Sequence, residues 1–488
     1  MRVSAVIDGL PVETSSDHDP DVTGITQGSR FVKEGYLFVA LVGKTFDGRA
    51  FIPDALERGA VGVMSSGPPP PDYDRVWLSA KDPRWLIGPM ASRIYGHPDR
   101  HMLMIGITGT NGKSTVSYLM VGILEAAGYP TGTIGSLGHQ FGGEVLGTDR
   151  TTPEASHLNR LLARMLDSGA QAISAEISSQ GLSLGRVEGL SFDLGVFTNL
   201  TRDHFDFHRD FEDYFQAKRR LFDQLKPDGQ AVVNLDDPFG RRLADELPRV
   251  RTFGDGGEVY SKTVEFSPEG IRGVLVTPRG ELSFESPLLG TYNLSNIVAA
   301  AATAEALDLP HEDIARGIAA QRPLTGRLEP VDCGQSFPVL IDYAHTDAAL
   351  EASLMALRSF SDHKILLVFG CGGDRDPGKR ALMGRVAGEL ADLSIITTDN
   401  PRREDPLAII AEVEKGIKAS GNQNYRILPD RREAIRRAVA QADDDWAVLI
   451  AGKGHEGFQI VGDRRSSFSD RQEVERALEE KLGTRTGG

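Results

Sequence analysis

The sequence predicts an α/β protein of three domains, of which the second and third are built on mostly parallel sheets. The chain has 488 residues, a length that suggests about three domains. Hydrophobic residues make up 40% of it, which is enough for sizeable cores. Short apolar runs alternate with helical patterns through two long blocks, residues 99–328 and 329–488, and a block at 1–98 precedes them.

Composition narrows the classes of partner and compartment. The formal net charge is −15, from 54 basic and 69 acidic residues. Because the phosphate backbones of nucleic acids select basic surfaces, this charge argues against a general nucleic-acid binder. Two cysteines, Cys333 and Cys371, are too few for a disulfide framework. No apolar signal segment opens the sequence, and no run approaches the roughly 18 apolar residues of a membrane span. We therefore expect a cytoplasmic monomer with small-molecule substrates, no nucleic-acid partner and no membrane span.

The N-terminal block, residues 1–98, contains strand-like apolar runs at 36–42, 61–64 and 76–78. The sequence GHPD at 96–99 is typical of a linker. We therefore place the first domain boundary at residue 98.

A strand, a glycine-rich turn and a helix follow one another at residues 102–127. The apolar run 102–107 predicts a buried strand, and apolar residues recur at helical spacing after the turn. The glycines of the turn let backbone N–H groups converge on phosphate oxygens at a helix N-terminus. Lys113 supplies a mobile positive charge, and Ser114 or Thr115 a hydroxyl for Mg²⁺. The stretch predicts a P-loop-type central domain.

The match to the common phosphate-loop pattern GxxxxGK[ST] is incomplete. Ile107 occupies the position of its first glycine, and Gly106 lies one residue early. The alternative is a glycine-rich turn that binds no ligand, but the strand, the Lys-Ser pair and the helix together favour a phosphate site.

Other strands of the central block end in polar residues. The run 172–175 leads into Glu176, and the run 194–197 leads towards His204. Ligands of parallel sheets lie beyond the carboxyl ends of the strands, so Glu176 and His204 are candidate Mg²⁺ ligands, although Mg²⁺ prefers oxygen. The alternative is that each is a turn or capping residue. Residues 253–290, with several glycines and alternating Val and Phe, predict a small antiparallel part.

One apolar helical face in the central block contains a lysine. With Asp210 as the N-cap, the face comprises Phe211, Tyr214, Phe215, Lys218, Leu221, Phe222 and Leu225. Such a lysine usually snorkels, with its stem packed and its ammonium in water. The alternative is a buried amine of lowered pKa, which can react with CO₂ to form a carbamate, a carboxylate-like metal ligand.

Four strand-like runs of the C-terminal block, at 339–341, 365–369, 393–397 and 447–450, end in charged or polar residues. This pattern predicts a Rossmann-like, doubly wound domain with one functional edge. The polar set suits a zwitterion and comprises Arg375, Asp399, Asn400, Pro401, Arg402 and Glu456. Arginines can take a carboxylate in bidentate fashion, and acids can take an ammonium. The alternative is a group of solvated charges at loop ends.

Several motifs carry a resemblance that covers nearly the whole chain. TGTNGKST at 108–115 resembles the ATP loop of the Mur ligases, and DYAHT at 342–346 resembles their C-terminal signature. TNLTRDH at 198–204 and GRLE at 326–329 also fit.

Within that family, the chain is similar to the members that add meso-diaminopimelate. SR at 29–30, LFVA at 37–40 and DGR at 47–49 are similar to their nucleotide-substrate domain, and DNPR at 399–402 resembles their signature. Folylpolyglutamate synthases share the ATP loop, but the N-terminal block and DNPR do not fit them.

The resemblance implies an ATP-dependent ligase of peptidoglycan precursor synthesis. It would join meso-diaminopimelate to the D-Glu carboxylate of UDP-MurNAc-L-Ala-D-Glu through an acyl-phosphate, with Mg²⁺ as cofactor. Residues 1–98 would bind the UDP-MurNAc substrate, 99–328 ATP, and 329–488 the amino acid. The same reaction with L-lysine, a kinase and a P-loop regulatory NTPase are the alternatives.

The resemblance also implies site residues. ATP would be bound by Gly109, Thr110, Asn111, Gly112, Lys113, Ser114, Thr115, Asn296, Arg327 and Asp342. The catalytic residues would be Lys113, Glu176, His204, Lys218 and Arg327. The Mg²⁺ ligands would be Ser114, Glu176, His204 and Lys218, the last as N6-carboxylysine. UDP-MurNAc-dipeptide would be bound by Ser29, Thr151, Thr152, Ser178 and Arg186. Diaminopimelate would be bound by Arg375, Asp399, Asn400, Pro401, Arg402, Gly452 and Glu456. Asp347 departs from the family's usual proline, which puts the local turn in question.

Overall fold

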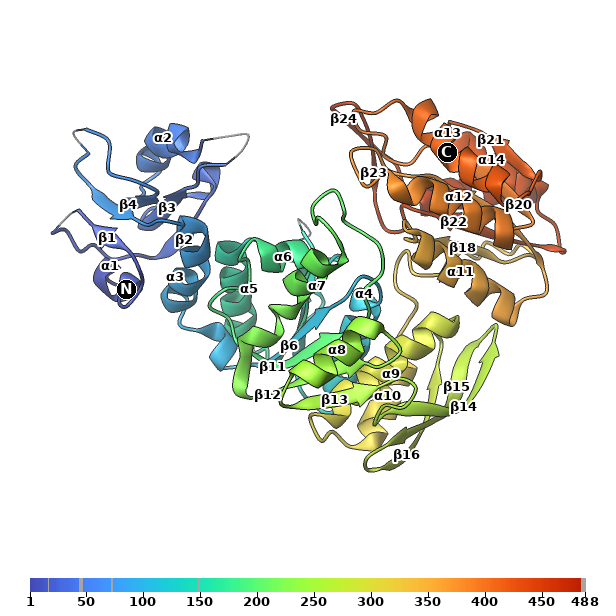
Figure 1. Cartoon of the computed structure of the whole chain (residues 1–488), viewed down its shortest axis with the longest axis horizontal. Helices are drawn as coiled ribbons and strands as arrows, with labels where there is room; N and C mark the ends of the chain where they lie inside the picture. The colour runs from blue at the N-terminus through green and yellow to red at the C-terminus, as the bar shows by residue number, and fades with distance from the viewer. Residues whose placement is uncertain (16, 44–46, 72, 148–149, 484–488) are drawn as a thin grey trace.

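The structure is a computed structural model that describes residues 1–15, 17–43, 47–71, 73–147 and 150–483. Three lobes, each with its own main sheet, follow one another in the order of the chain (Figure 1). The α/β fold class is confirmed, while the domain limits at residues 98 and 328 stay predictions. Among the helices of the described residues, none combines the length and the apolar character that a membrane crossing requires.

The first lobe has a five-stranded sheet in the order β1-β5-β4-β3-β2, parallel except for the edge strand β1. Its elements are α1 (Val3–Ile7), β1 (Glu13–Thr14), β2 (Gly24–Thr26), η1 (Ser29–Phe31), β3 (Tyr36–Ala40), η2 (Gly48–Phe51), α2 (Ile52–Glu57), β4 (Gly62–Ser65), β5 (Val76–Ser79), η3 (Pro83–Leu86), α3 (Ile87–Ile94) and η4 (Pro98–Arg100). The three predicted strands are β3, β4 and β5. β3 is buried along its whole length, as expected of a parallel strand covered on both faces.

Helix α3 joins the first lobe to the second. Ile87 and Met90 of α3 share an apolar cluster with Ala155, the first residue of α5 (Ala155–Asp167). Ser156 Oγ also donates to Gln27 Oε1 at 2.9 Å. The first lobe therefore rests on α5 through both apolar and polar contacts.

The central lobe has an eight-stranded sheet in the order β13-β12-β11-β6-β10-β7-β8-β9. Its strands are β6 (Leu103–Thr108), β7 (Thr131–Ile134), β8 (His139–Phe141), β9 (Glu144–Gly147), β10 (Ala172–Glu176), β11 (Phe192–Phe197), β12 (Leu225–Asn234) and β13 (Val250–Phe253). The strands from β13 to β7 are parallel, and β8 and β9 form an antiparallel edge. In register, Glu176 pairs with Ile107, and Phe197 pairs with Thr108. The carboxyl ends of β10, β6 and β11 therefore meet at one edge.

Helices cover both faces of the central sheet. They are α4 (Lys113–Ala126), α5, α6 (Ser179–Ser183), α7 (Phe211–Arg219), α8 (Pro238–Glu246), α9 (Thr291–Glu305) and α10 (His311–Ala320). One apolar core joins the sheet to α4, α9 and α10, and the other joins it to α5, α6, α7 and α8. The predicted antiparallel part is a three-stranded sheet of β14 (Tyr260–Ser267), β15 (Gly270–Thr277) and β16 (Gly280–Ser286).

The helix that contains Lys218 is shorter than predicted. Asp210 caps α7 as expected, because its side chain accepts from the Asp213 N–H at 2.8 Å. The helix ends at Arg219, and a single 3₁₀ turn, η5 (Phe222–Gln224), follows it. The prediction that Leu225 shares the helical face is wrong, since Leu225 begins β12. Pro227 contributes to this outcome, because a proline disfavours helix in the residue before it and cannot continue one itself.

The third lobe has a six-stranded sheet in the order β17-β18-β22-β19-β20-β21. Its elements are β17 (Glu329–Pro330), β18 (Val339–Asp342), α11 (Asp347–Phe360), β19 (Lys364–Phe369), α12 (Gly378–Leu390), β20 (Leu393–Ile396), α13 (Pro406–Ala419), β21 (Tyr425–Ile427), α14 (Arg431–Gln441), β22 (Trp446–Ala451), β23 (Phe458–Val461), β24 (Arg464–Ser467) and α15 (Asp470–Leu482). Except for β17 the sheet is parallel, with α11, α12 and α13 on one face and α14 and α15 on the other. The doubly wound prediction is confirmed.

Asp347 does not prevent the local turn. It is the first residue of α11, and the Thr346 side chain caps that helix by accepting from the Ala349 N–H at 3.2 Å. An acidic residue in the first turn also interacts favourably with the helix dipole, so a good helix start remains without the proline.

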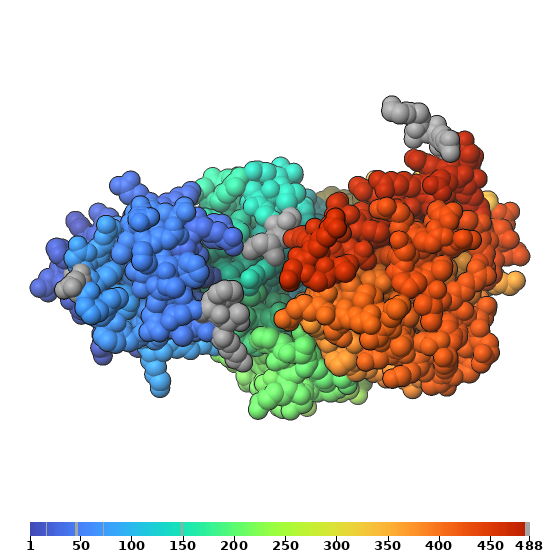
Figure 2. Space-filling view, turned by 90° about the horizontal axis from the view of Figure 1, so that it is seen from above, coloured from blue at the N-terminus to red at the C-terminus, as the bar shows by residue number. Residues whose placement is uncertain are grey.

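The three lobes leave a hollow over the central one. Seen from above, the first and third lobes stand on either side of the central lobe, whose surface lies deeper between them (Figure 2).

Candidate active site

The turn after β6 approaches its neighbours too closely for side chains. Gly109 has φ 150° and Gly112 φ 86°, values that favour glycine. A Cβ at Gly109 would collide with Thr198 Oγ1, and one at Gly112 with Asn296 Oδ1. Lys113, the first residue of α4, folds over the turn and donates to the carbonyls of Gly109 (2.9 Å) and Thr110 (2.8 Å). The turn thus has the strand, glycines, lysine and helix N-terminus of a phosphate cradle.

A cluster of hard oxygen atoms lies beside this turn. Ser114 Oγ donates to Glu176 Oε2 at 3.0 Å, and the Ser136 N–H donates to Glu176 Oε1 at 3.0 Å. Arg327 Nη2, from the segment before β17, reaches Ser114 Oγ at 3.4 Å. Within the described ranges, no three His, Cys, Asp or Glu side chains gather as a metal site on their own. The oxygen cluster still fits Mg²⁺, which is usually held by one or two carboxylates together with substrate phosphates.

Lys218 points inward, so the snorkelling alternative is wrong. The residue is 1% exposed, and its Nζ donates to the Gly109 carbonyl at 2.7 Å and lies 4.4 Å from the centre of the Tyr214 ring. Burial, and then the nearby charge of Lys113, hold the pKa of Lys218 well below its ordinary value. The amine therefore has the environment that favours a neutral, reactive form, directly beneath the phosphate turn.

His204 lies at the mouth of this region in a left-handed backbone conformation, with φ 56°. Its Nε2 lies 3.5 Å from Asp203 Oδ2, and desolvation lowers its pKa to about 4. Asp203 also faces two residues of the third lobe, His345 (Nε2 to Oδ2 3.5 Å) and Lys379 (Nζ to Oδ1 3.8 Å). Burial alone would raise the pKa of Asp203, but these neighbouring groups outweigh it and hold that pKa well below its ordinary value.

A cavity of about 260 Å³ extends from the turn between the central and third lobes. Its lining includes Asn111, Ser114, Asn296, Arg327 and Asp342. The cavity therefore brings together predicted ATP residues of both lobes, while Gly109, Thr110 and Lys113 lie outside its lining.

Two of those residues are held firmly. The Arg327 guanidinium lies over the Tyr343 ring at 4.9 Å. The Asp342 carboxylate accepts from the N–H groups of Leu328 (2.7 Å) and Ala344 (2.8 Å) and from Ser353 Oγ (3.1 Å). Asp342 therefore fixes the junction of the two lobes in addition to lining the cavity.

A larger cleft, of about 1370 Å³, lies next to the oxygen cluster. Its lining includes Ser136 and Thr151 from the central lobe and Tyr343 and Glu456 from the third. Ser136 links the cleft to the oxygen cluster, and Tyr343 lines both cavities. The cleft and the 260 Å³ cavity therefore share one wall residue, Tyr343.

The residues predicted to bind the dipeptide nucleotide are only partly brought together. Thr152 Oγ1 donates to the Glu176 carbonyl and accepts from the Ser178 N–H, both at 2.9 Å. Arg186 Nη1 donates to the Thr152 carbonyl at 3.2 Å. These residues surround the base of Glu176, next to Thr151, whereas Ser29 lies in η1 of the first lobe.

The predicted amino-acid set converges at the edge of the third sheet. Asn400 Nδ2 donates to Glu456 Oε2 at 2.8 Å, and the Asn400 N–H donates to Asp399 Oδ1 at 2.6 Å. Arg402, with φ 50°, donates to the Gly373 carbonyl at 2.6 Å, and burial, followed by the charge of Arg375, lowers its pKa. The solvated-charge alternative is therefore wrong for Asn400 and Asp399, which are buried.

The rest of the set lies around this core. Arg375 reaches across to Asp206 of the central lobe at 3.6 Å. A Cβ on Gly452 would meet Asp399 Oδ2 at 2.9 Å, and Gly452 has φ 113°, so glycine suits this position. Pro401 is buried between Asn400 and Arg402.

Sequence reasoning missed three residues of this region. Asp203 stands inside the motif TNLTRDH, and Lys453 follows the strand-like run 447–450, but neither is among the predicted site residues. Ser136 carries no signal in the sequence, since only the fold brings it to Glu176.

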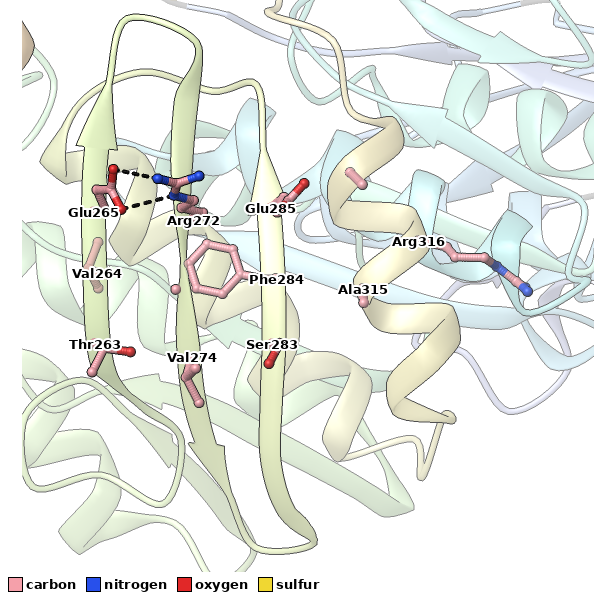
Figure 3. Close-up of a pocket in the computed structure, with 12 residues that line it drawn as sticks. Thr263, Val264, Glu265, Arg272, Val274, Ser283, Phe284, Glu285, Ala315 and Arg316 are labelled. Carbon is pink, nitrogen blue, oxygen red and sulfur yellow. Dashed lines mark hydrogen bonds and ion pairs between the residues drawn. The ribbon is translucent and has the colours of Figure 1, made fainter.

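A separate groove of about 740 Å³ lies between the small antiparallel sheet and α10. Figure 3 shows Val264 and Phe284 on the strands and Ala315 on the helix, with Glu265 and Arg272 paired. Val274 lies on the other face of the small sheet, in register with Thr263 and Ser283. None of the predicted site residues lines this groove.

Comparison with known proteins identifies the family of the chain. Three family models match the chain: the Mur ligase middle domain at residues 107–304, the Mur ligase glutamate ligase domain at 326–454, and the Mur ligase family catalytic domain at 21–79. A curated relative from Geobacter metallireducens, named UDP-N-acetylmuramoyl-L-alanyl-D-glutamate--2,6-diaminopimelate ligase, is 43% identical over 96% of each chain.

Solved structures give the same result. One described as UDP-N-acetylmuramoyl-L-alanyl-D-glutamate--2,6-diaminopimelate ligase is 33% identical, covers 94% of this chain and 95% of its own, and has a TM-score of 0.66. MurF from Acinetobacter baumannii, at 19% identity, covers 99% of this chain and 98% of its own with a TM-score of 0.70, a likeness of fold alone. With a curated relative this similar along nearly its whole length, the chain belongs to the Mur ligase family.

Proposed function

We propose that the protein is an ATP-dependent ligase that joins meso-diaminopimelate to the D-Glu carboxylate of UDP-MurNAc-L-Ala-D-Glu, in peptidoglycan precursor synthesis. The observation that carries the proposal is the shared cleft. Ser136, whose N–H donates a hydrogen bond to Glu176, lines the cleft together with Thr151 and Glu456. Thr151, predicted for the dipeptide nucleotide, and Glu456, predicted for the amino acid, thus face one space. The predicted metal ligand Glu176 adjoins that space through its hydrogen bond from Ser136, and a peptide-bond-forming reaction requires such proximity.

The reaction that fits this space activates the carboxylate first. A carboxylate oxygen attacks the γ-phosphorus of ATP and displaces ADP, which forms an acyl-phosphate. The amine of the third amino acid then attacks the acyl carbon, and the C–O bond to phosphate breaks. Lys113 and Arg327 provide positive charge where the triphosphate and the carboxylate meet, and positioning with charge neutralisation dominates phosphoryl transfer.

We propose Ser114 and Glu176 as the residues that hold Mg²⁺, with His204 and Lys218 for a second ion. When bound, Mg²⁺ neutralises phosphate charge and orients the γ-phosphoryl group. Lys218 would serve as a carbamate, because a cationic ammonium cannot ligate a metal. The support is geometric: Lys218 is fully enclosed, contacts the Gly109 carbonyl, and already has the cation of Lys113 near it.

The choice of diaminopimelate over L-lysine follows from charge. The two amino acids differ by one distal carboxylate, and Arg402 and Arg375 lie where they could take it. Arg402 now donates to carbonyls rather than to a carboxylate. L-lysine would leave Arg402 without an anionic partner, so its rejection is expected, whereas Arg375 already faces Asp206 at 3.6 Å. The curated relative named for 2,6-diaminopimelate agrees with this choice.

The remaining assignments complete the proposal. Residues 1–98 would hold the uridine side of the nucleotide, with Ser29 in contact, while Thr151, Thr152, Ser178 and Arg186 would hold the sugar-peptide. The enzyme would act as a cytoplasmic monomer.

An omission assay tests the proposal. ADP and phosphate release is measured with ATP, Mg²⁺, UDP-MurNAc-L-Ala-D-Glu and meso-diaminopimelate, and then with each left out in turn. A ligase sustains release only with the full mixture. ADP release without the amino acid and without free phosphate would indicate a kinase, because the phosphoryl group stays on the product. Release of ADP and phosphate with ATP alone would indicate a regulatory NTPase.

A further inference from the structure

Lys453 is a cation buried behind the amino-acid set. It follows β22, and its side chain is 0% exposed. Burying an ammonium is costly unless hydrogen-bonded partners compensate. Lys453 Nζ donates to Glu456 Oε2 at 3.0 Å and to Asn400 Oδ1 at 3.3 Å. Its partners are therefore two of the residues proposed to receive the amino acid.

These three side chains form a closed triangle. Asn400 Nδ2 donates to Glu456 Oε2 at 2.8 Å, and the Ile460 N–H donates to Asn400 Oδ1 at 2.9 Å. Because Oδ1 faces two donors, the orientation of the Asn400 amide is determined, and its NH₂ must point to Glu456. Among the described residues, Asn400 and Lys453 donate hydrogen bonds to the Glu456 carboxylate, and Oε2 is the acceptor of both.

The other oxygen of Glu456 is thereby left for the cleft. Glu456 lines the 1370 Å³ cleft, and a carboxylate has lone pairs for further donors on its second oxygen. We propose that Lys453 is a positioning residue, whose buried ammonium holds Glu456 and Asn400 in the orientation that receives the amino group of the incoming amino acid. This inference rests on the proposed function.

The consequence of losing Lys453 is specific to one substrate. Without the ammonium, Glu456 keeps a single donor and can rotate, while the phosphate turn and the oxygen cluster lie in the other lobe. We expect Lys453→Met to raise KM for meso-diaminopimelate by about 10- to 150-fold, the range for hydrogen bonds to charged groups. KM for ATP should stay within about twofold. Lys415→Met, the same change at an exposed position on α13, is the matched control and should alter neither constant.

A double-mutant cycle separates positioning from a structural role. KM for meso-diaminopimelate is measured for wild type, Lys453→Met, Glu456→Gln and the double variant. If Lys453 acts through Glu456, the second substitution adds little to the first. The inference would be overturned if the effects of the two substitutions on KM multiplied in the double variant, or if Lys453→Met left KM unchanged. Should Lys453→Met yield no folded protein, Lys453→Gln takes its place in the cycle. Wild-type enzyme that does not ligate the amino acid would overturn the proposed function instead.

Discussion

Arg202 of the central lobe donates two hydrogen bonds to Asp376 of the third lobe, Nε to Oδ2 at 2.9 Å and Nη2 to Oδ1 at 3.2 Å. Asp376 also accepts from the Gly378 N–H, and a Cβ at Gly378 would collide with the Arg202 guanidinium. Arg375 and Lys379 face Asp206 and Asp203 nearby. The loop that follows β11 therefore contacts the third lobe both through ion pairs and through close packing at Gly378.

Arg202→Ala should loosen this docking. A bidentate pair between charged groups is worth more than a neutral hydrogen bond, so we expect kcat/KM to fall about 3- to 10-fold. Amide hydrogen exchange should quicken in residues 374–379. Arg241→Ala is the control, because that side chain donates to the Leu235 carbonyl within the central lobe. Exchange in 374–379 as slow as in wild type would contradict the docking role.

Lys218→Ala should collapse turnover, with a loss on the order of 10²–10³ in kcat, because the proposed carbamate ligand would be lost from the phosphate site. Small acids such as acetate should restore part of it. Lys218→Arg keeps a cation but cannot form a carbamate, so it should be as inactive as Lys218→Ala.

Carbamylation itself is measured by carbon NMR with ¹³C-bicarbonate. Wild type should show a carbamate signal that Lys218→Arg lacks, and removal of CO₂ should lower activity reversibly. Undiminished ligation by Lys218→Ala would contradict the metal-binding role.

Arg402→Ala should lose meso-diaminopimelate use. Loss of a charge-assisted hydrogen bond to the distal carboxylate should lower kcat/KM for this substrate about 10- to 150-fold. Arg403→Ala is a matched control, since the neighbouring Arg403 is exposed and pairs with Asp374 at 3.0 Å. If Arg402→Ala uses diaminopimelate and L-lysine as wild type does, the assignment of the distal carboxylate is wrong.

Glu305 should make folding stability depend on pH. It is 2% exposed, and Arg279 binds both its oxygens (2.8 and 2.9 Å) while His311 Nε2 lies 2.6 Å away. Burial alone would raise the pKa of Glu305, but these two partners outweigh it, so the folded pKa lies below the ordinary value. A lowered folded pKa gives stability that is present above the unfolded pKa and lost as pH falls through the folded one.

Urea unfolding of wild type and Glu305→Gln at a series of pH values tests this. Stability of the wild type should fall more steeply below about pH 4.5, near the ordinary pKa of Glu. Asp308, whose charge also acts on Arg279, is present in both proteins and therefore does not contribute to the difference between them. If the free energy of unfolding depended on pH in the same way in the two proteins, the lowered pKa of Glu305 in the folded state would be contradicted.

The sequence predicts those parts of the fold that depend on local pattern. Apolar runs ending in Glu176, Asp342 or Gly370 are strands, because a strand buried on both faces must be apolar throughout. Parallel strands also end at one edge, so the meeting of Glu176 with Ser114 followed from connectivity. Leu225 was misassigned because apolar spacing continues past the helix, while Pro227 acts only through backbone geometry.

Contacts between residues far apart in the chain could not be predicted in this way. Lys453 stands in a glycine-rich run where a lysine is ordinarily solvated, and only the approach of Asn400 makes it a buried partner. Lys218 shows the same limit: spacing placed it on an apolar face, but packing under Gly109 decided between solvent and burial.

The central claim is that the carboxylate is activated by phosphoryl transfer in the shared cleft. The direct measurement uses UDP-MurNAc-L-Ala-D-Glu with ¹⁸O in both oxygens of the D-Glu carboxylate, and mass spectrometry of the phosphate released with ATP and meso-diaminopimelate. The account predicts one ¹⁸O in each phosphate, because the carboxylate oxygen that attacks phosphorus leaves with it. Phosphate without label, released while the amino acid is consumed, would contradict it.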